Sequence, residues 1–457
     1  MRLNSRFPRF PAFQAYLDSL GMFHMDMGLA RIQSAIKALS LDPPPCPSIQ
    51  VVGTNGKGST STFLAQIFAS SGLVTGLYTS PHFLSPRERI LVNGEQLPET
   101  LWLDGAEAVL SVSEDRSPDY RLTYFELLTV TAAWMFREAS CQATVFEAGL
   151  GGAHDATTAL THHLTVFTPI GLDHVAILGP TLADIARDKG QAMRAGVPAV
   201  SADQEPRVSQ ILAETADAQG APLFFAKDVA AQALAQGLQW PDEPSMPGPH
   251  QADNLRLALA AFHILTTGTT PTFPGPAIEQ ASPPFPGLAS RQTSPAFSGL
   301  GKDPQVLFEA ARLAFIPGRF QIIPSGDGLP ELVLDGAHNE PGLACLARAL
   351  AHLGMKPQVM IFACLADKDL PTMLPLVRAL TDGPIIVPGL NVPGRAMDPA
   401  ELAAQIGGLT LPVADMAQAL EKVRGLAGPG GPVLICGSLY LLAEVYTLRP
   451  EWLNRQQ

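Results

Sequence analysis

A glycine-rich turn between a strand pattern and a helix pattern constrains this chain more than any other stretch. The apolar run 49–52 is typical of a buried strand, and residues 59–71 place apolar side chains on one face of a helix. Three glycines and Lys57 lie between them. Glycines let backbone N–H groups turn inward around a phosphate, and the helix N-terminus and the lysine add positive charge. The stretch predicts a nucleotide site; the alternative is a glycine-rich turn with a solvated lysine.

The spacing in this turn differs from that of the ordinary phosphate-binding loop. That loop needs a glycine where Val51 stands and a hydroxyl residue where Gly58 stands. The sequence Gly-Thr-Asn-Gly-Lys-Gly-Ser resembles instead the nucleotide loop of the Mur ligase superfamily, in its folylpolyglutamate synthase and dihydrofolate synthase branch. The resemblance implies an ATP-binding loop made of Thr54, Asn55, Gly56, Lys57, Gly58, Ser59 and Thr60.

Length, charge and cysteine usage limit the class of protein. A chain of 457 residues is too long for one core and predicts two or three domains. The formal net charge of -12, without a run of Lys or Arg, argues against a nucleic-acid-binding protein. The five widely spaced cysteines are typical of free thiols in a reducing compartment, and the N-terminus is neither a secretory signal nor a membrane span. We therefore expect a cytoplasmic protein without a membrane partner, and a monomer.

Strand and helix patterns alternate along the first part of the chain. Strands are predicted at 49–52, 73–79, 144–146, 165–170 and 197–200, with helices at 59–71, 124–139 and 182–193. Such alternation is the signature of a parallel α/β sheet, in which ligands collect at the carboxyl ends of the strands. Ser80, Glu147 and His174 each follow or end a predicted strand. These three side chains are therefore candidates for one site.

A change of composition marks a boundary between two domains. Residues 266–301 are rich in Pro, Ser, Thr and Gly and predict a loop insertion or linker. A second alternating series follows, with strands at 332–334, 359–362, 384–387 and 433–436 and helices at 342–353, 370–380, 399–406 and 414–426. We expect an α/β fold made of an N-terminal P-loop-type, parallel-sheet ATPase domain (1–298) and a smaller C-terminal Rossmann-like domain (312–457).

Three further motifs strengthen the resemblance and imply a magnesium site. The segments 78–82, 145–152 and 172–179 are similar to the family's Thr-Ser-Pro-His, Glu-x-Gly-Leu-Gly-Gly and Asp-His-x-x-x-Leu-Gly motifs. Ser80, Glu147 and His174 stand at the positions of the family's metal ligands in these motifs. Oxygen ligands completed by phosphate and water suit Mg²⁺, and we expect two such ions.

A lysine motif adds a further implied feature. The segment 182–190 resembles the family's Ile-Ala-x-Glu-Lys-Ala-Gly, whose lysine is carbamylated and supports a magnesium ion; Lys189 is the matching residue. The alternative is a solvated helix lysine. The chain departs from the family at Ala153-His154, at Thr158 and at Gly190-Gln191, which leaves details of metal or substrate contact around Asp155 open.

The remaining motifs imply nucleotide and substrate contacts. The segment 250–254 is similar to His-Gln-x-x-Asn, so Asn254 would contact ATP. The Pro-Gly-Arg at 317–319 implies that Arg319 contacts the phosphates. The alternative is that Arg319 forms an interdomain salt bridge. The Asp-Gly-Ala-His-Asn at 335–339 implies that Asp335 and His338 contact the nucleotide and the incoming amino acid.

The resemblance implies a ligase. ATP would phosphorylate a carboxylate of dihydropteroate or a reduced folate, and the amino group of L-glutamate would attack the acyl phosphate. Lys57, Lys189, Asp335 and His338 would be its catalytic residues. One alternative is another Mur-type amino-acid ligase, although only about 48 residues precede the first strand. The other is a nucleotide-binding regulatory protein with a degenerate site.

Overall fold

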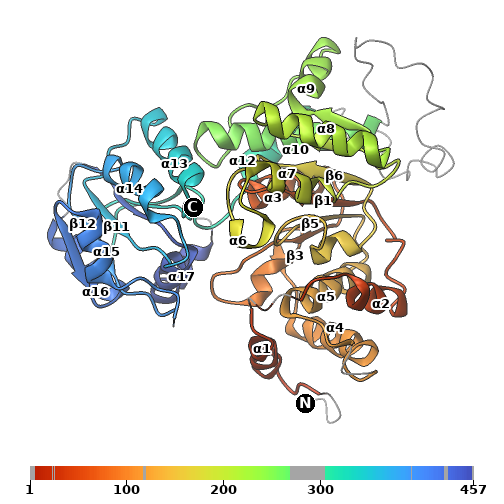
Figure 1. The fold of residues 1–457 in the computed structure, drawn as a ribbon, viewed down its shortest axis with the longest axis horizontal. Coiled ribbons are helices and arrows are strands. Elements are labelled where there is room, and N and C mark those ends of the chain that lie inside the picture. The colour runs from red at the N-terminus through yellow and green to blue at the C-terminus, as the bar shows by residue number, and fades with distance from the viewer. Residues whose placement is uncertain are drawn as a thin grey trace. The chain divides into compact units, whose positions relative to one another are not determined.

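The computed structural model describes most of the chain, and the described residues divide into two compact units (Figure 1). The described residues are 6–22, 24, 26–116, 120–267, 304–392, 394–426 and 431–454. The first unit comprises Met1–His82, Pro86–Glu243 and Asp253–Leu313, and the second comprises Phe83–Ser85, Pro244–Ala252 and Ala314–Gln457.

An eight-stranded sheet forms the centre of the first unit, in the order β4-β3-β2-β5-β1-β6-β7-β8. The strands are β1 (Ser48–Val52), β2 (Thr75–Tyr78), β3 (Ile90–Val92), β4 (Glu95–Gln96), β5 (Ala143–Glu147), β6 (Leu164–Phe167), β7 (Ala199–Ser201) and β8 (Leu223–Phe225). Along the sheet order β2-β5-β1-β6-β7-β8, each strand is parallel to its neighbour. Strands β3 and β4 extend the β2 edge of the sheet as antiparallel strands. Both β1 and β5 are buried along their whole length, as expected for central strands of a parallel sheet.

Two apolar clusters join helices of the first unit to this sheet. The helices are α1 (Phe10–Ser19), α2 (Ala30–Ala38), α3 (Lys57–Ser70), α4 (Glu99–Val112), α5 (Tyr124–Glu138), α6 (Val175–Leu178), α7 (Leu182–Gly190), α8 (Pro206–Gln219), α9 (Ala226–Ala235), α10 (Pro249–Thr267) and α12 (Pro304–Leu313). Of α10, the residues from Asp253 onward belong to this unit. One cluster joins α1, α2, α4 and α5 to Tyr78 and Phe146 of the sheet. Another joins α7 and α8 to Val52 and Phe167.

A six-stranded sheet forms the centre of the second unit, in the order β13-β12-β11-β14-β10-β9. Its strands are β9 (Gln321–Ile323), β10 (Leu332–Leu334), β11 (Val359–Phe362), β12 (Ile385–Pro388), β13 (Thr410–Val413) and β14 (Val433–Cys436). Only β9 pairs antiparallel to its neighbour within this sheet as described. Helices α13 (Glu340–His352), α14 (Leu370–Ala379), α15 (Pro399–Ile406), α16 (Met416–Leu426) and α17 (Leu439–Leu448) complete the unit. The two-domain α/β fold expected from the sequence is thus confirmed.

Most expected elements are present, with shifted ends that have local causes. The strands predicted at 332–334, 359–362 and 433–436 and the helix at 399–406 coincide with β10, β11, β14 and α15. The strand predicted over 165–170 ends at Phe167, because Pro169 cannot donate a ladder hydrogen bond. Of the proline-rich segment 266–301, residues 266 and 267 belong to α10 and the rest lies outside the described residues.

Two further findings bear on the expected class of protein. All five cysteines are free thiols, and burial raises the pKa of Cys46 to about 11 and that of Cys141 to about 12. In the part of the chain that is described, no helix is both long enough and apolar enough to cross a membrane.

Candidate active site

The nucleotide loop lies at the carboxyl end of β1, and its glycines are held in conformations that other residues avoid. Gly56 has φ +85° directly before α3 begins at Lys57. A Cβ on Gly56 would lie 2.4 Å from Oδ1 of Asn254, and a Cβ on Gly53 would lie 1.9 Å from Oγ1 of Thr168. The loop is therefore packed too closely for side chains at these two positions. The same packing brings Asn254, expected from its motif to reach the nucleotide, against the loop.

The end of β6 anchors the first half of this loop. Thr54 and Asn55 donate their N–H groups to the carbonyl oxygen of Pro169, at 3.0 and 3.3 Å. The Thr54 hydroxyl lies 3.0 Å from both the N and the O of Gly171. Because these two N–H groups are already used, donors for a phosphate must come from Gly56 onward.

The second half of the loop still offers donors. Near the start of α3, the Oγ1 of Thr60 and the Oγ of Ser61 are buried and have no hydrogen-bond partner among the described residues. Unsatisfied buried hydroxyls are costly unless a ligand or water pairs with them. A helix N-terminus with spare donors matches the chemistry of a phosphate group. The loop therefore fits the nucleotide expected from the sequence.

Glu147 lies beside one of the other two predicted metal ligands, Ser80. It ends β5, is buried, and its Oε2 accepts the N–H of Ser80 at 2.9 Å. A Cβ on Gly58 of the nucleotide loop would lie 3.5 Å from Oε1 of Glu147. These contacts follow from the sheet order, because β5 lies between β2, which Ser80 follows, and β1, which the loop follows. One carboxylate therefore lies beside both the loop and the Ser80 turn.

His174 is placed differently from the other two candidates. It lies in the loop after β6, is exposed, and has a left-handed φ of +52° directly before α6 begins at Val175. Its N–H is donated to the carboxylate of Asp173 at 2.9 Å. Within the described ranges, no group of three or more His, Cys, Asp or Glu side chains is placed to hold a metal ion. A metal at Glu147 would therefore need hydroxyl, phosphate or water oxygens to complete its shell, which suits Mg²⁺.

Lys189 is buried at the base of the nucleotide loop. Its Nζ donates to the carbonyl oxygen of Gly53 at 2.9 Å, and Nζ of Lys57 donates to the same oxygen at 3.2 Å. Burial, and secondly the nearby charge of Lys57, together lower the pKa of Lys189 to about 7, against the opposing effects of Asp188, Asp155 and Asp173. The solvated-lysine interpretation of Lys189 is thus wrong. A large fraction of this amine is neutral at pH 7.

Thr158, one of the positions where the chain departs from the family, lies in a tightly bonded loop. Asp155 is buried and accepts N–H groups of Leu150 and Thr157, at 2.8 and 2.9 Å; burial raises its pKa. Thr158 donates its hydroxyl to the carbonyl oxygen of Gly152 at 2.7 Å and accepts from Nε2 of Gln50 at 2.7 Å. Thr158 therefore holds the Gly-Leu-Gly-Gly loop with its hydroxyl.

The second unit carries its own cluster of predicted residues. Asp335 follows β10, is buried, and accepts the N–H groups of Phe320 and Ala337, each at 2.8 Å. Burial raises the pKa of Asp335, and the Arg319 guanidinium opposes that rise. A Cβ on Gly336 would lie 2.3 Å from Nη1 of Arg319, and Nδ1 of His338 lies 2.7 Å from the Gly336 oxygen. Arg319, Asp335 and His338 thus surround one glycine.

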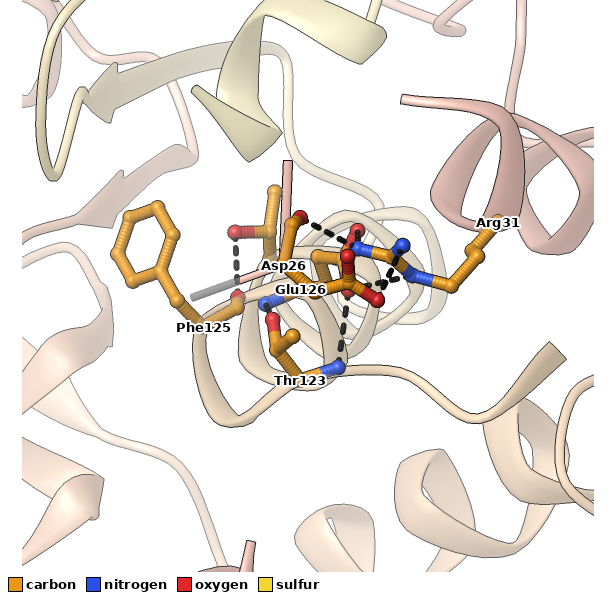
Figure 2. A network of polar contacts seen from close by, with 6 residues as sticks. Asp26, Arg31, Thr123, Phe125 and Glu126 are labelled. Atoms are coloured by element: carbon orange, nitrogen blue, oxygen red, sulfur yellow. Dashed lines mark hydrogen bonds and ion pairs between the residues drawn. The ribbon is translucent and has the colours of Figure 1, made fainter. Parts of the chain in front are cut away.

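A polar network at the start of α5 was not anticipated from the sequence (Figure 2). Thr123 and Glu126 form a capping box, and Glu126 also pairs with Arg31 at 3.0 Å. Arg31 in turn pairs with the carboxylate of Asp26 at 2.7 Å (Figure 2). The Thr-x-x-Glu spacing is the sequence signal for this capping box, and the helix predicted over 124–139 does begin at Tyr124. The network ties the segment before α2 to the first turn of α5.

A second group was missed because its members are far apart in sequence. Arg89 ends the 3₁₀ turn Pro86–Arg89 and donates from Nε to Nδ1 of His82 at 2.8 Å. Its guanidinium carbon lies 5.3 Å from the centre of the Tyr124 ring. No local pattern in the sequence indicates this pairing.

Comparison with known proteins gives the family. Residues 318–439 match the family "Mur ligase, glutamate ligase domain". The chain is 29% identical over 432 residues to the dihydrofolate synthase/folylpolyglutamate synthase of Escherichia coli, covering 94% of this chain and 93% of the relative. Its fold is similar to that of E. coli FolC in complex with DHPP and ADP, with a TM-score of 0.78 at 27% identity, covering 97% of this chain and 98% of the other.

A second solved structure agrees. The bifunctional folylpolyglutamate synthase/dihydrofolate synthase of Yersinia pestis, complexed with AMPPNP and a Mn ion, matches with a TM-score of 0.77 at 28% identity, covering 97% of this chain and 98% of that one. The motifs, the fold and these relatives agree, and the chain belongs to the folylpolyglutamate synthase and dihydrofolate synthase branch of the Mur ligase superfamily.

Proposed function

We propose that this protein is an ATP- and Mg²⁺-dependent ligase that adds L-glutamate to dihydropteroate, to tetrahydrofolate, or to both, through an acyl phosphate. The names of its relatives support this activity. The observation that carries it is the meeting of Lys57 and Lys189 on the Gly53 carbonyl, beside a loop whose Gly58 lies against Glu147. Motifs far apart in the sequence thereby contribute to one phosphate site.

The chain's own residues bind and orient the nucleotide. We assign the phosphates to residues 54–60, with N–H donors from Gly56 onward and the charge of Lys57. Asn254, packed against Gly56, is assigned to the nucleotide, as are Arg319 and Asp335 of the second unit. His338 and Asp335 are assigned to the incoming amino acid. Positioning and charge neutralisation of this kind supply most of the catalysis in phosphoryl transfer.

We assign Ser80, Glu147 and His174 to Mg²⁺. The Glu147 carboxylate supplies the charged oxygen that such an ion prefers, and the Ser80 N–H holds this carboxylate in place. When bound, the metal supplies positive charge that offsets the charge developing on the transferred phosphoryl group. The number of ions is proposed to be two.

We propose that the second ion is supported by a carbamate on Lys189. With its pKa lowered to about 7, the Lys189 amine is substantially neutral and nucleophilic at physiological pH. Its nitrogen lone pair would attack the carbon of CO₂, one proton would leave to water, and the product would be an N-carboxylate anion. That anion replaces the amine beside the Lys57 ammonium, so two groups of opposite charge then lie near the Gly53 carbonyl.

The test is ATP- and Mg²⁺-dependent phosphate release by the purified protein with L-glutamate and, separately, dihydropteroate or tetrahydrofolate. Release with both acceptors supports a bifunctional ligase, and release with one fixes the branch. Glu147→Ala should abolish release, whereas Glu138→Ala, which removes an exposed carboxylate paired with Arg137, should not. Clear ATP binding without release would favour the regulatory alternative.

Several coarser expectations belong to the same proposal. We retain a cytoplasmic, monomeric protein that acts on small molecules, without nucleic-acid or membrane partners. We also retain the domain bounds 1–298 and 312–457 as proposals.

A further inference from the structure

Arg89 is a buried cation that has no carboxylate partner among the residues that the structure describes. Its side chain and backbone together are 3% exposed. Nε is donated to His82, and in the described part of the chain neither Nη1 nor Nη2 makes a hydrogen bond or ion pair. A buried charge without a counter-ion is costly, so a guanidinium in this state calls for a partner.

The groups around Arg89 do not supply that partner. His82 is half-buried, and its Nδ1 accepts the hydrogen bond from Nε of Arg89, so it supplies a lone pair but no negative charge. Tyr124 is 1% exposed, burial raises its pKa, and its hydroxyl has no hydrogen-bond partner among the described residues. The two NH₂ groups of the Arg89 guanidinium and the hydroxyl of Tyr124 are therefore available as hydrogen-bond donors.

These donors lie next to the candidate metal site. The carbonyl oxygen of Arg89 accepts the N–H of Thr79 at 2.9 Å, and its side chain holds His82. Arg89 therefore contacts the residues on both sides of the Ser80–Pro81 step, and the N–H of Ser80 reaches Glu147. A ligand group bound by Arg89 would lie close to the predicted place of phosphoryl transfer.

We propose that Arg89 binds the carboxylate of the acceptor substrate, with the Tyr124 hydroxyl as a second donor. The inference rests on the proposed function and deepens it by naming a specificity-determining residue. The planar fork of a guanidinium matches a carboxylate in two parallel hydrogen bonds. Phosphate is the less suitable occupant, because the loop at Gly56 already provides a site for it. The acceptor, by contrast, must present a carboxylate close to that site.

Arg87 provides a matched control on the same 3₁₀ turn. Its guanidinium is paired with Glu99 at 3.2 Å and donates to the carbonyl oxygen of Leu97 at 3.2 Å. It also lies over the Phe10 ring, at 5.8 Å from the ring centre. Removal of this charge leaves Arg89 and Tyr124 intact, so it reports the general effect of losing an arginine from the turn.

The experiment compares two ligands in binding to the full-length protein with ADP and Mg²⁺ present. One ligand is dihydropteroate, and the other is its analogue that lacks the carboxylate. In Arg89→Gln, we expect dihydropteroate to bind about tenfold more weakly or worse, and the analogue to bind as it does in the wild type. Arg87→Gln should change neither. Arg89→Lys should recover part of the affinity, and Tyr124→Phe should lose about threefold.

The outcomes separate this inference from the proposed function. If Arg89→Gln weakens both ligands equally, or neither, Arg89 only holds the Ser80 turn and the inference is wrong. A rise in the KM for ATP without a rise in the KM for the acceptor would overturn it as well. If the wild-type protein neither binds dihydropteroate nor releases phosphate with it or with tetrahydrofolate, the proposed function itself fails.

Discussion

Lys57 and Lys189 donate to one carbonyl oxygen, that of Gly53, from positions 132 residues apart in the sequence. Two ammonium groups on one acceptor repel each other, and burial worsens the repulsion at Lys189. The arrangement becomes favourable when one of the two loses its charge or becomes an anion. The carbamate proposed on Lys189 would have this effect.

The first prediction concerns that carbamate. Lys189→Ala should lower kcat by about a hundredfold or more, because the proposed anion beside the phosphate site is lost. Formate or acetate should restore part of the activity by placing a carboxylate in the vacated space. Mass spectrometry of the wild-type protein in bicarbonate should find the added CO₂ at Lys189. Full activity of Lys189→Ala would contradict the assignment.

The second prediction uses two glycines with the same backbone conformation. Gly56 and Gly72 both have φ +85°, but a Cβ on Gly56 meets Asn254 at 2.4 Å, whereas a Cβ on Gly72 meets nothing within 4 Å. Gly72→Ala should cost only the strain of the left-handed conformation, about 1–2 kcal/mol. Gly56→Ala should in addition displace Asn254 and weaken ATP binding by more than tenfold. Thermal unfolding measures the stability of the two variants, and calorimetric titration measures their affinity for ATP. The same ATP affinity in Gly56→Ala and Gly72→Ala would refute the role of Asn254.

The third prediction concerns the carboxylate of Glu147. Glu147→Gln keeps an oxygen that can accept the Ser80 N–H but removes the negative charge. The Mg²⁺ concentration for half-maximal activity should therefore rise at least about tenfold, because charged oxygen ligands dominate magnesium binding. A titration of phosphate release against Mg²⁺ measures it, with Glu138→Gln as the control. An unchanged Mg²⁺ requirement would remove Glu147 from the metal site.

The fourth prediction is a loss of stability in acid caused by His162. Burial lowers its pKa to about 4, and its ring nitrogens contact the Ser48 hydroxyl at 2.9 Å and the Thr157 oxygen at 2.8 Å. Between its unfolded pKa of about 6.5 and pH 4, the unfolded chain binds more protons than the folded chain, so stability falls as pH falls through that window. The loss is on the order of 3 kcal/mol at pH 4 and below.

Unfolding by urea at pH 7.0 and at pH 4.5 tests this prediction. Substitution His162→Gln should lower stability at pH 7.0 but reduce the difference between the two pH values. The same difference in wild type and variant would show that other groups, such as His82, account for the acid sensitivity.

Much of the fold could be predicted because central parallel strands are continuous apolar runs. The strands 332–334, 359–362 and 433–436 are of this kind and were located to the residue. The edge strands β4, with both residues exposed, and β9 are short and carry no such signal. Their pairing depends on neighbours that are distant in the sequence, so local pattern could not reveal them.

The candidate site was predictable where its residues follow strands. Because β2, β5, β1 and β6 are consecutive in the sheet, the residues after them are brought to one edge. What the sequence could not indicate was the electrostatic state of each group. The lowered pKa of Lys189 and the unpaired donors of Arg89 depend on burial and on contacts through space.

The anchoring of the nucleotide loop to Pro169 and Gly171 has a thermodynamic consequence. His174 lies three residues beyond Gly171, so the segment that carries the candidate metal ligand is tied through Thr54 to the segment that carries the phosphate donors. If a bound nucleotide restricts the motion of one segment, these hydrogen bonds restrict the other as well, and a metal ion then loses less entropy on binding. By linkage, the metal must raise the affinity for nucleotide by the same factor. Cooperative binding of nucleotide and metal would then arise from the hydrogen bonds that join Thr54 and Asn55 to Pro169 and Gly171, rather than from a change of fold.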